Sequence, residues 1–206
     1  MFVSSAIVFQ SSCKINKILY NIFMSIEQTM INVGGSHESY RERELSNFSP
    51  HAFQFRGFEI ENVEAFVQGL KYGEDDPFRY EVFKMRAPRA KRKSPKIPPE
   101  IIVWEGQAMR YRSLDHFRLQ AAAIFAKFDQ NEDAQDALLA TGNLSLVHDL
   151  GHSEKPNTCL PADVFTKILE ETRMQFFKEM GVSSTVLIGE RPSIFIDDYI
   201  INYARS

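Results

Sequence analysis

The sequence has little of what marks several common protein classes. Its 206 residues include only two cysteines, Cys13 and Cys159, which lie far apart and fit no metal-ligand spacing. This excludes a disulfide scaffold and a cysteine-based zinc site, and we expect a reducing, cytoplasmic location. The formal net charge is −3, so no overall positive field draws the chain to nucleic acid or to an anionic membrane.

The best-defined catalytic motifs are absent too. There is no Gly-rich phosphate loop with a lysine, no dinucleotide-binding glycine fingerprint and no nucleophile elbow. His116, His148 and His152 lack the partner spacing of metal ligands. We therefore predict neither a metal nor a cofactor.

The N-terminal stretch is apolar but short. Residues 2–9 are followed closely by Lys14 and Lys17, and a membrane span needs about 20 apolar residues. We therefore predict no membrane partner, and a loose extension over residues 1–36 with the domain at 37–206. Translation starting at Met24 or Met30 is a further hypothesis, which N-terminal sequencing would test.

The composition is that of a globular chain with one sizeable core. Hydrophobic residues make up 44% and aromatic residues 12%, and a domain usually has about 100–200 residues. Apolar residues recur with helical spacing in several segments. These predict helices over residues 62–71, 75–83, 114–128, 131–142 and 162–181.

Strand-like patterns are short and fewer. They predict strands at 52–56, which Gly57 closes, and at 144–147, with further strands at 186–188 and 194–196. Prolines 88, 95, 98 and 99 predict an irregular loop over 87–99. The predicted fold class is α+β, mainly helical, in a single compact domain with a few short strands.

Two blocks of residues stand out against this background. The first has Leu45, then Ser46-Asn47-Phe48, then Gly57 and Glu64. The second has Lys127-Phe128 and Gln130, then residues 138–141 (Leu-Leu-Ala-Thr) and Leu146-Val147. Both blocks resemble the NADAR family, whose best-known members are the YbiA-like N-glycosidases, and the resemblance covers residues 45 to about 173.

The resemblance implies an enzyme that hydrolyses an N-glycosidic bond in a nucleotide-like substrate. Substrates of such proteins include ADP-ribosyl-guanine in DNA and phosphoribosylaminopyrimidine intermediates of riboflavin synthesis. Glu64 is the implied catalytic residue, because a carboxylate stabilises the positive charge that builds on the anomeric carbon and can deprotonate water. In the first turn of a helix it gains about 0.3–1 kcal/mol in its ionised form, so we expect a base.

The other residues of the two blocks and their helical neighbours are candidates for substrate binding. Asn47 is expected to bind sugar hydroxyls, Phe48 to stack on the base, and Gln68 and Lys71 to reach the same ligand one and two turns after Glu64. The remaining candidates, for phosphate oxygens and the downstream loop, are Lys127, Thr141, Gly142 and Asp149.

Purely structural roles compete with several of these assignments. Phe48 and Phe128 are aromatic residues of the kind usually buried in a core, and Gly142 fits a helix stop. Without the family pattern, the helix face that carries Glu64, Gln68 and Lys71 would be interpreted as an ordinary solvated surface.

Residues 149–161 depart from the family, which usually has an Asp, Trp and Gly-rich loop there. Residues 149–161 contain no tryptophan, and the later Asn and Leu-Gly pair is half kept as Asn157 and Leu160-Pro161. Ala65 replaces the histidine that follows the family's glutamate. A non-catalytic module that binds ADP-ribose or NAD is therefore the alternative function.

Residues 84–96, the basic segment, contain seven lysines and arginines. Such a segment grips a pyrophosphate or follows a DNA backbone, or else it is a solvated loop. The predicted partners are an ADP-ribose-containing or phosphoribosyl small molecule and, through the basic segment, ADP-ribosylated DNA. A helical protein whose basic segment contacts nucleic acid, without any nucleotide site, is a third possibility.

Overall fold

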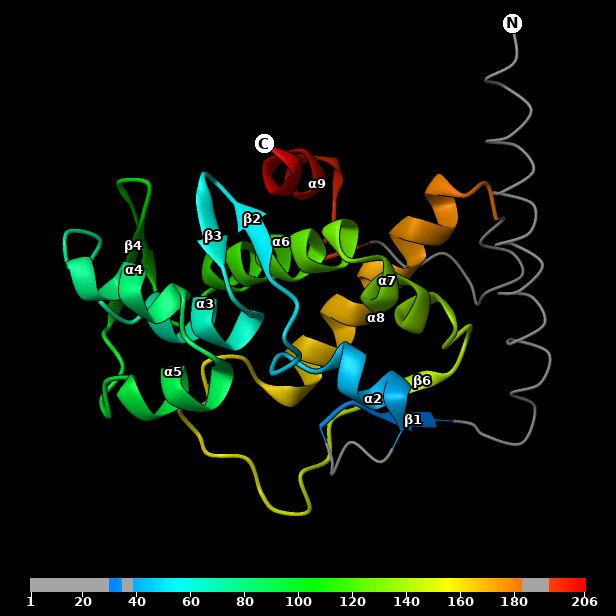
Figure 1. Cartoon of the computed structure of the whole chain (residues 1–206), viewed down its shortest axis with the longest axis horizontal. Helices are drawn as coiled ribbons and strands as arrows, with labels where there is room; N and C mark the ends of the chain where they lie inside the picture. Colours follow the sequence, from blue (N-terminus) through cyan, green and yellow to red (C-terminus); the bar gives the residue numbers. More distant parts are fainter. Residues whose placement is uncertain (1–29, 35–38, 183–192) are drawn as a thin grey trace, which may run out of the picture.

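A computed structural model describes residues 30–34, 39–182 and 193–206. The long helix α6 (Leu114–Gln130) runs through the middle of the molecule and contacts α9, β2, α7, α3, α8 and β5 (Figure 1). The Ser113 hydroxyl caps it by accepting from the His116 backbone N–H. Its alanines at 121–123 and Ile124 and Phe125 are fully buried, so the predicted central helix is confirmed.

Two antiparallel hairpins flank the core. Strands β2 (Phe53–Phe55) and β3 (Phe58–Ile60) form one, and β4 (Ile101–Trp104) and β5 (Gln107–Arg110) form the other. Each turn has two consecutive residues with positive φ, Arg56-Gly57 and Glu105-Gly106, the geometry that favours glycine in two-residue hairpins. The sequence predicted only the first strand of the four.

Three short helices follow one another beside the hairpins (Figure 1). They are α3 (Val63–Gly69), α4 (Pro77–Phe83) and α5 (Ala87–Lys93), and α3 contacts both of the others. The prediction of an irregular loop over 87–99 was wrong for its first half. Pro88 lies in the first turn of α5, where a proline removes no intrahelical hydrogen bond.

On the other side of α6, helix α7 (Glu132–Leu139) leads to β6 (Ser145–Val147). Strand β6 pairs in parallel with β1 (Met30–Asn32), with Ile31 opposite Leu146. Ile31 and Val33 are buried in the main core. Residues 30–34 therefore belong to the folded domain, and the predicted loose extension is wrong for them. Residues 1–29 lie outside the described residues.

Helix α8 (Ala162–Glu179) confirms the last predicted long helix, and Gly181 follows it with a φ of 72°. The strand predicted at 194–196 is wrong: this stretch is a turn, and α9 (Asp198–Arg205) follows it. The strand predicted at 186–188 lies outside the described residues.

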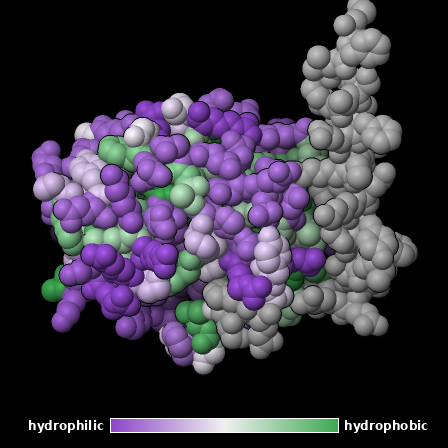
Figure 2. All heavy atoms as spheres, viewed as in Figure 1, coloured by the Kyte–Doolittle hydropathy of each residue, from purple (hydrophilic) through white to green (hydrophobic). Residues whose placement is uncertain are grey.

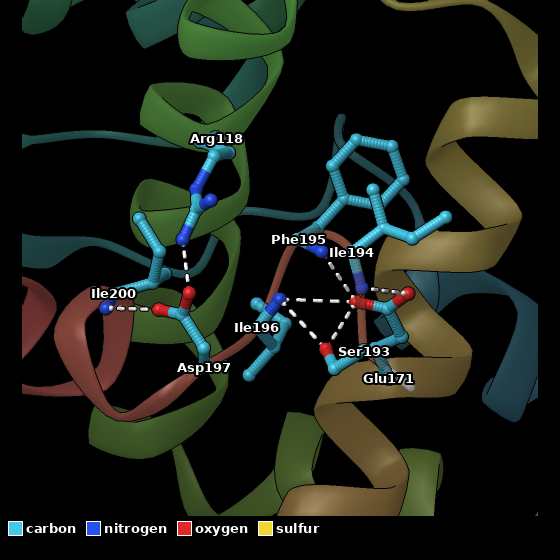
Figure 3. Close-up of polar contacts among 8 residues, drawn as sticks. All are labelled: Arg118, Glu171, Ser193, Ile194, Phe195, Ile196, Asp197 and Ile200. Carbon is cyan, nitrogen blue, oxygen red and sulfur yellow. Dashed lines mark hydrogen bonds and ion pairs between the residues drawn. The ribbon is translucent and has the colours of Figure 1, made fainter. Parts of the chain in front are cut away.

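The turn at 194–196 is held by one carboxylate (Figure 3). Glu171 on α8 accepts from the backbone N–H groups of Ile194, Phe195 and Ile196 and from the Ser193 hydroxyl, at 2.6–3.0 Å. Asp197 caps α9 at the Ile200 N–H and pairs with Arg118 of α6. A carboxylate therefore satisfies the backbone groups that a strand would have paired.

Helix α2 (Tyr40–Leu45) begins at a capping box formed by Ser39 and Glu42. Together these elements confirm a mainly helical α+β domain. The face drawn in Figure 2 is largely hydrophilic, with apolar residues scattered between charged ones. Within the described residues, no helix is long and apolar enough to cross a membrane.

Candidate functional site

Helix α3 places Glu64 in its first turn, as the sequence predicted. The Asn62 side chain caps the helix by accepting from the Ala65 N–H at 2.8 Å, and its amide donates to the Met85 carbonyl at 3.1 Å. The Glu64 N–H itself donates to the Asn47 carbonyl at 3.0 Å. The Ser46-Asn47-Phe48 loop and the catalytic candidate are thus joined through the backbone.

Two polar residues of α3, Glu64 and Gln68, and Lys71 just after the end of the helix form one hydrogen-bonded row, the α3 row. Gln68 Nε2 donates to Glu64 Oε1 at 2.9 Å, and Lys71 Nζ donates to Gln68 Oε1 at 2.7 Å. Glu64 and Gln68 are 7% and 6% exposed, so this face is not the solvated helix surface that the spacing alone would suggest. A buried carboxyl and a buried amide on α3 are thus linked to an ammonium in the turn that follows the helix.

Burial decides the acidity of Glu64. It raises the pKa of the carboxyl above its usual value, while the charge of Lys91, the hydrogen bond from Gln68 and the charge of Lys71 act in the opposite direction. Desolvation therefore opposes the helix terminus, which favours the ionised carboxylate, and the net shift of the pKa is upward. A carboxyl with a raised pKa exchanges protons more readily near neutral pH.

Phe48 does not belong to the core. It is 39% exposed, and Lys91 Nζ of α5 lies 5.1 Å from the centre of its ring. The core alternative for Phe48 is thus wrong, whereas Phe128 is 1% exposed and is a core residue. Asn47 is half-buried; it lies between Ser46, which is buried, and Phe48, which is exposed.

Lys127 lies behind the loop instead of facing solvent. It is 1% exposed, and its Nζ donates to the Glu44 and Ser46 carbonyls at 2.8 and 3.0 Å. Burial lowers the pKa of this ammonium to about 7. Its contacts are those of a residue that ties α6 to the end of α2 and to the loop.

A second polar group adjoins the α3 row. Burial lowers the pKa of His116 to about 4, with Lys71 adding to the effect, and raises the pKa of the Cys159 thiol. His116 Nδ1 accepts from the Arg112 N–H at 2.9 Å, and the other ring nitrogen, Nε2, faces the Gln120 side chain. The Gln120 amide lies 2.9 Å from that Nε2 and 3.8 Å from Cys159 Sγ.

Thr141 and Gly142 make their contacts elsewhere. The Thr141 hydroxyl donates to the Leu138 carbonyl at 2.6 Å and accepts from Arg173 Nη1 at 2.7 Å. Gly142 follows α7 with a φ of 57°, in keeping with its role as a helix stop. Arg173 also donates to the Leu144 carbonyl, so this cluster joins α7, β6 and α8.

Asp149 is exposed at the start of the segment that departs from the family. Its backbone exchanges two hydrogen bonds of 2.9 Å with the Asn32 amide, and its carboxylate accepts from the Gly151 N–H at 2.7 Å. Further along, Tyr111 donates to the Asn157 carbonyl at 3.1 Å, and Arg112 donates to the Pro156 carbonyl. The segment is therefore tied down near both ends.

Part of the basic segment surrounds a hollow of about 360 Å³. The hollow is lined by Lys84, Met85, Arg86, Pro88, Arg89 and Arg92. In the described part of the chain, no three His, Cys, Asp or Glu side chains are grouped as metal ligands.

The family described as Bacteriophage protein GP30.3 matches residues 39–174, which include the α3 row and most of α8. The chain belongs to this family. No curated protein matches the sequence.

The GP30.3 family chain is also similar to the NMR structure of the Escherichia coli protein YbiA. The TM-score is 0.56 at 22% identity, over 74% of this chain and 87% of the YbiA chain. At this identity the likeness establishes a YbiA-like fold.

The structure therefore brings Glu64, Gln68, Lys71, Asn47 and Phe48 together in this GP30.3 family domain. It separates Thr141 and Gly142, and it buries Lys127. The sequence did not predict which residues of other elements lie near the α3 row. These are Lys91, Tyr111, His116, Gln120 and Cys159.

Proposed function

We propose that this domain is a NADAR-like N-glycosidase, a hydrolase that acts on a nucleotide-like N-glycoside with Glu64 as its catalytic carboxyl. One observation carries the proposal: the Glu64 carboxyl is buried in the first turn of α3, in a hydrogen-bonded row with Gln68 and Lys71. A carboxylate costs free energy to bury, so its retention at such a position points to chemistry.

The chemistry follows from the residues present. As the C1′–N bond breaks, its electron pair leaves with the base and positive charge builds on C1′. The Glu64 carboxylate stabilises this charge and takes a proton from a water whose oxygen bonds to C1′. The departing base gains a proton at nitrogen, so one water is consumed for each bond broken.

The supporting residues have distinct parts in this proposal. Asn47 hydrogen-bonds sugar hydroxyls, Phe48 flanks the base, and Lys71 faces a phosphate, while Lys127 positions the loop that carries the first two. In this proposal the basic segment contacts the backbone of ADP-ribosylated DNA, and a cytoplasmic location fits such substrates. Thr141, Gly142 and Asp149 remain candidates whose contacts in the structure are with other parts of the chain.

The test compares Glu64→Gln with Glu59→Gln, an exposed carboxylate on the neighbouring hairpin. Mass spectrometry follows ADP-ribosyl-guanine DNA and a ribosylaminopyrimidine phosphate in parallel. We expect the wild type and E59Q to release free ADP-ribose or free pyrimidine, and E64Q to lose turnover while binding persists. Full activity of E64Q would overturn the assignment.

A non-catalytic ADP-ribose or NAD-binding module is the second candidate. It is favoured by the segment 151–157, which lies exposed where the family has its aromatic loop. Calorimetry would then show tight binding of ADP-ribose, with no product after prolonged incubation.

A further inference from the structure

The connection between β6 and α8, residues 148–161, has no helix or strand of its own (Figure 1). Irregular connections of about 12–15 residues or more are uncommon in compact domains and are often functional loops. Residues 149–157, which we call the strap, are exposed, and Cys159 shortly after them is buried. Contacts with other elements must therefore decide where the strap lies.

The C-terminal end of the strap is held by the turn that joins β5 to α6. Tyr111 Oη donates to the Asn157 carbonyl at 3.1 Å, and the guanidinium of Arg112 donates to the Pro156 carbonyl. Two consecutive residues of the turn thus bind two consecutive carbonyls of the strap. We call this pair of contacts the latch.

The latch is built on buried groups of α6. The Arg112 N–H donates to His116 Nδ1 at 2.9 Å, which fixes the turn to the helix. Cys159 Sγ lies 4.0 Å from His116 Nε2 and 3.8 Å from Gln120 Nε2, and the His116 and Gln120 side chains are fully buried. The chain just after the strap is therefore packed against the same helix that follows the turn.

Arg112 has an unusual backbone conformation for an arginine. Its φ is 61°, at the third position of a β-turn that closes with the Ser113 N–H donating to the Arg110 carbonyl at 3.0 Å. Positive φ at this position favours glycine or asparagine. Among the described residues, the other non-glycine residues with positive φ are Arg56 and Glu105, which are in the hairpin turns. A glycine would adopt the conformation of Arg112 at lower cost, so the contact that the arginine side chain makes is what explains its presence.

The rest of the strap has tethers of its own. The Asp149 backbone exchanges two hydrogen bonds with the Asn32 amide, and the Glu154 carboxylate accepts from the Ala162 N–H at the start of α8 at 3.0 Å. Neither tether involves Arg112. Release of the latch should therefore loosen residues 155–158 and leave the remainder of the strap attached.

We propose that Arg112 is a positioning residue that latches the C-terminal end of the strap, and that substrate binding depends on this latch. The proposal rests on the proposed function, since the strap is taken to border the substrate: Cys159 packs on α6, and α6 contacts α3, which carries Glu64. Arg112 acts through the strap and takes no part in the chemistry.

Hydrogen exchange and urea unfolding test the latch without any enzymatic activity. Arg112→Gly and Arg112→Ala are compared with Arg110→Ala, which changes an exposed arginine of β5. We expect the amides of residues 155–158 to exchange about tenfold faster in both Arg112 variants, because both lose the bond to Pro156, and at the wild-type rate in R110A. R112G should unfold at a higher urea concentration than R112A, although both lack the latch, because glycine alone relieves the backbone strain.

The enzymatic readout applies R112G to the two substrates named under the proposed function. KM should rise about threefold or more while kcat stays within about twofold of wild type, because binding is weakened and the transition-state interaction of Glu64 is kept. Unchanged exchange of residues 155–158 in R112G would overturn the latch, and an unchanged KM despite faster exchange would overturn its link to substrate binding. A chain without N-glycosidase activity that still shows the exchange pattern would refute the proposed reaction and keep the latch.

Discussion

The Asn62 side chain offers a direct test of how the site is held in place. It is 1% exposed and does two things at once: its oxygen caps α3 at the Ala65 N–H, and its amide donates to the buried Met85 carbonyl. Asn62→Ala removes both contacts without adding bulk. The variant therefore leaves one buried donor and one buried acceptor unpaired.

The expected loss of stability can be worked out from the two contacts. Loss of an N-cap destabilises by about 1 kcal/mol, and an unsatisfied buried carbonyl adds about 1–3 kcal/mol. The free energy of unfolding of N62A should thus fall by about 2–4 kcal/mol. Asn62→Ser, which keeps a capping oxygen but cannot reach Met85 as a donor, should recover about 1 kcal/mol of this.

Urea unfolding followed by tryptophan fluorescence is a suitable assay. The chain has a single tryptophan, and the Trp104 ring lies 5.4 Å from the Phe66 ring of α3, so its emission reports on this region. Asn202→Ala, at an exposed position of α9, is the matched control and should stay within about 0.5 kcal/mol of wild type. A similarly small effect of N62A, or full recovery in N62S, would refute the reasoning.

Two further predictions concern the same region. A Cβ at Gly69 would lie 2.3 Å from the Phe83 ring, so Gly69→Ala should destabilise by about 1–3 kcal/mol in the same urea assay, while Gly73→Ala, with open space around it, should not. His116 has a folded pKa of about 4 against a usual 6.5, so its neutral form contributes stability that is complete above pH 6.5 and is lost as the pH falls toward 4. Between pH 6.5 and pH 5 the wild type should lose about 1.6 kcal/mol through this group. His116→Gln should remove that part of the pH dependence, and His152→Gln, at an exposed position, should keep it.

Local signals were enough to predict the long helices and the α3 row. Asn62 followed by apolar residues at helical spacing predicted α3, and the offsets of four and seven from Glu64 predicted that Gln68 and Lys71 share its face. These are properties of a single helix, which its own sequence determines. The structure adds that the face is buried, and this depends on what packs against it.

Signals that were present but overlooked explain other differences. Glu105-Gly106 stands between two β-prone stretches, and such a dipeptide is typical of a two-residue hairpin turn. Ser39 and Glu42 have the spacing of a capping box, which predicts the start of α2. Pro88 suggested a break in α5, although a proline in the first helical turn is compatible with a helix.

The remaining differences depend on contacts between distant segments. Ile194-Phe195-Ile196 has the composition of a strand, and the Glu171 carboxylate, 23 or more residues earlier, helps to hold it in a turn. Lys91 was one charge among seven in the sequence, and its contact with the Phe48 ring depends on the packing of Ala90 of α5 against Ala65 of α3. The spacing of residues within one segment does not predict such contacts between distant segments.

The two motif blocks acquire a common physical meaning in the structure. Lys127 of the second block binds the Ser46 carbonyl of the first, and the next carbonyl, that of Asn47, accepts from the Glu64 N–H. Helix α6 thus fixes the loop, and the loop fixes the start of the helix that carries the carboxyl. A lysine that resemblance suggested as a phosphate ligand accordingly acts through the backbone, by holding the loop that meets the start of α3.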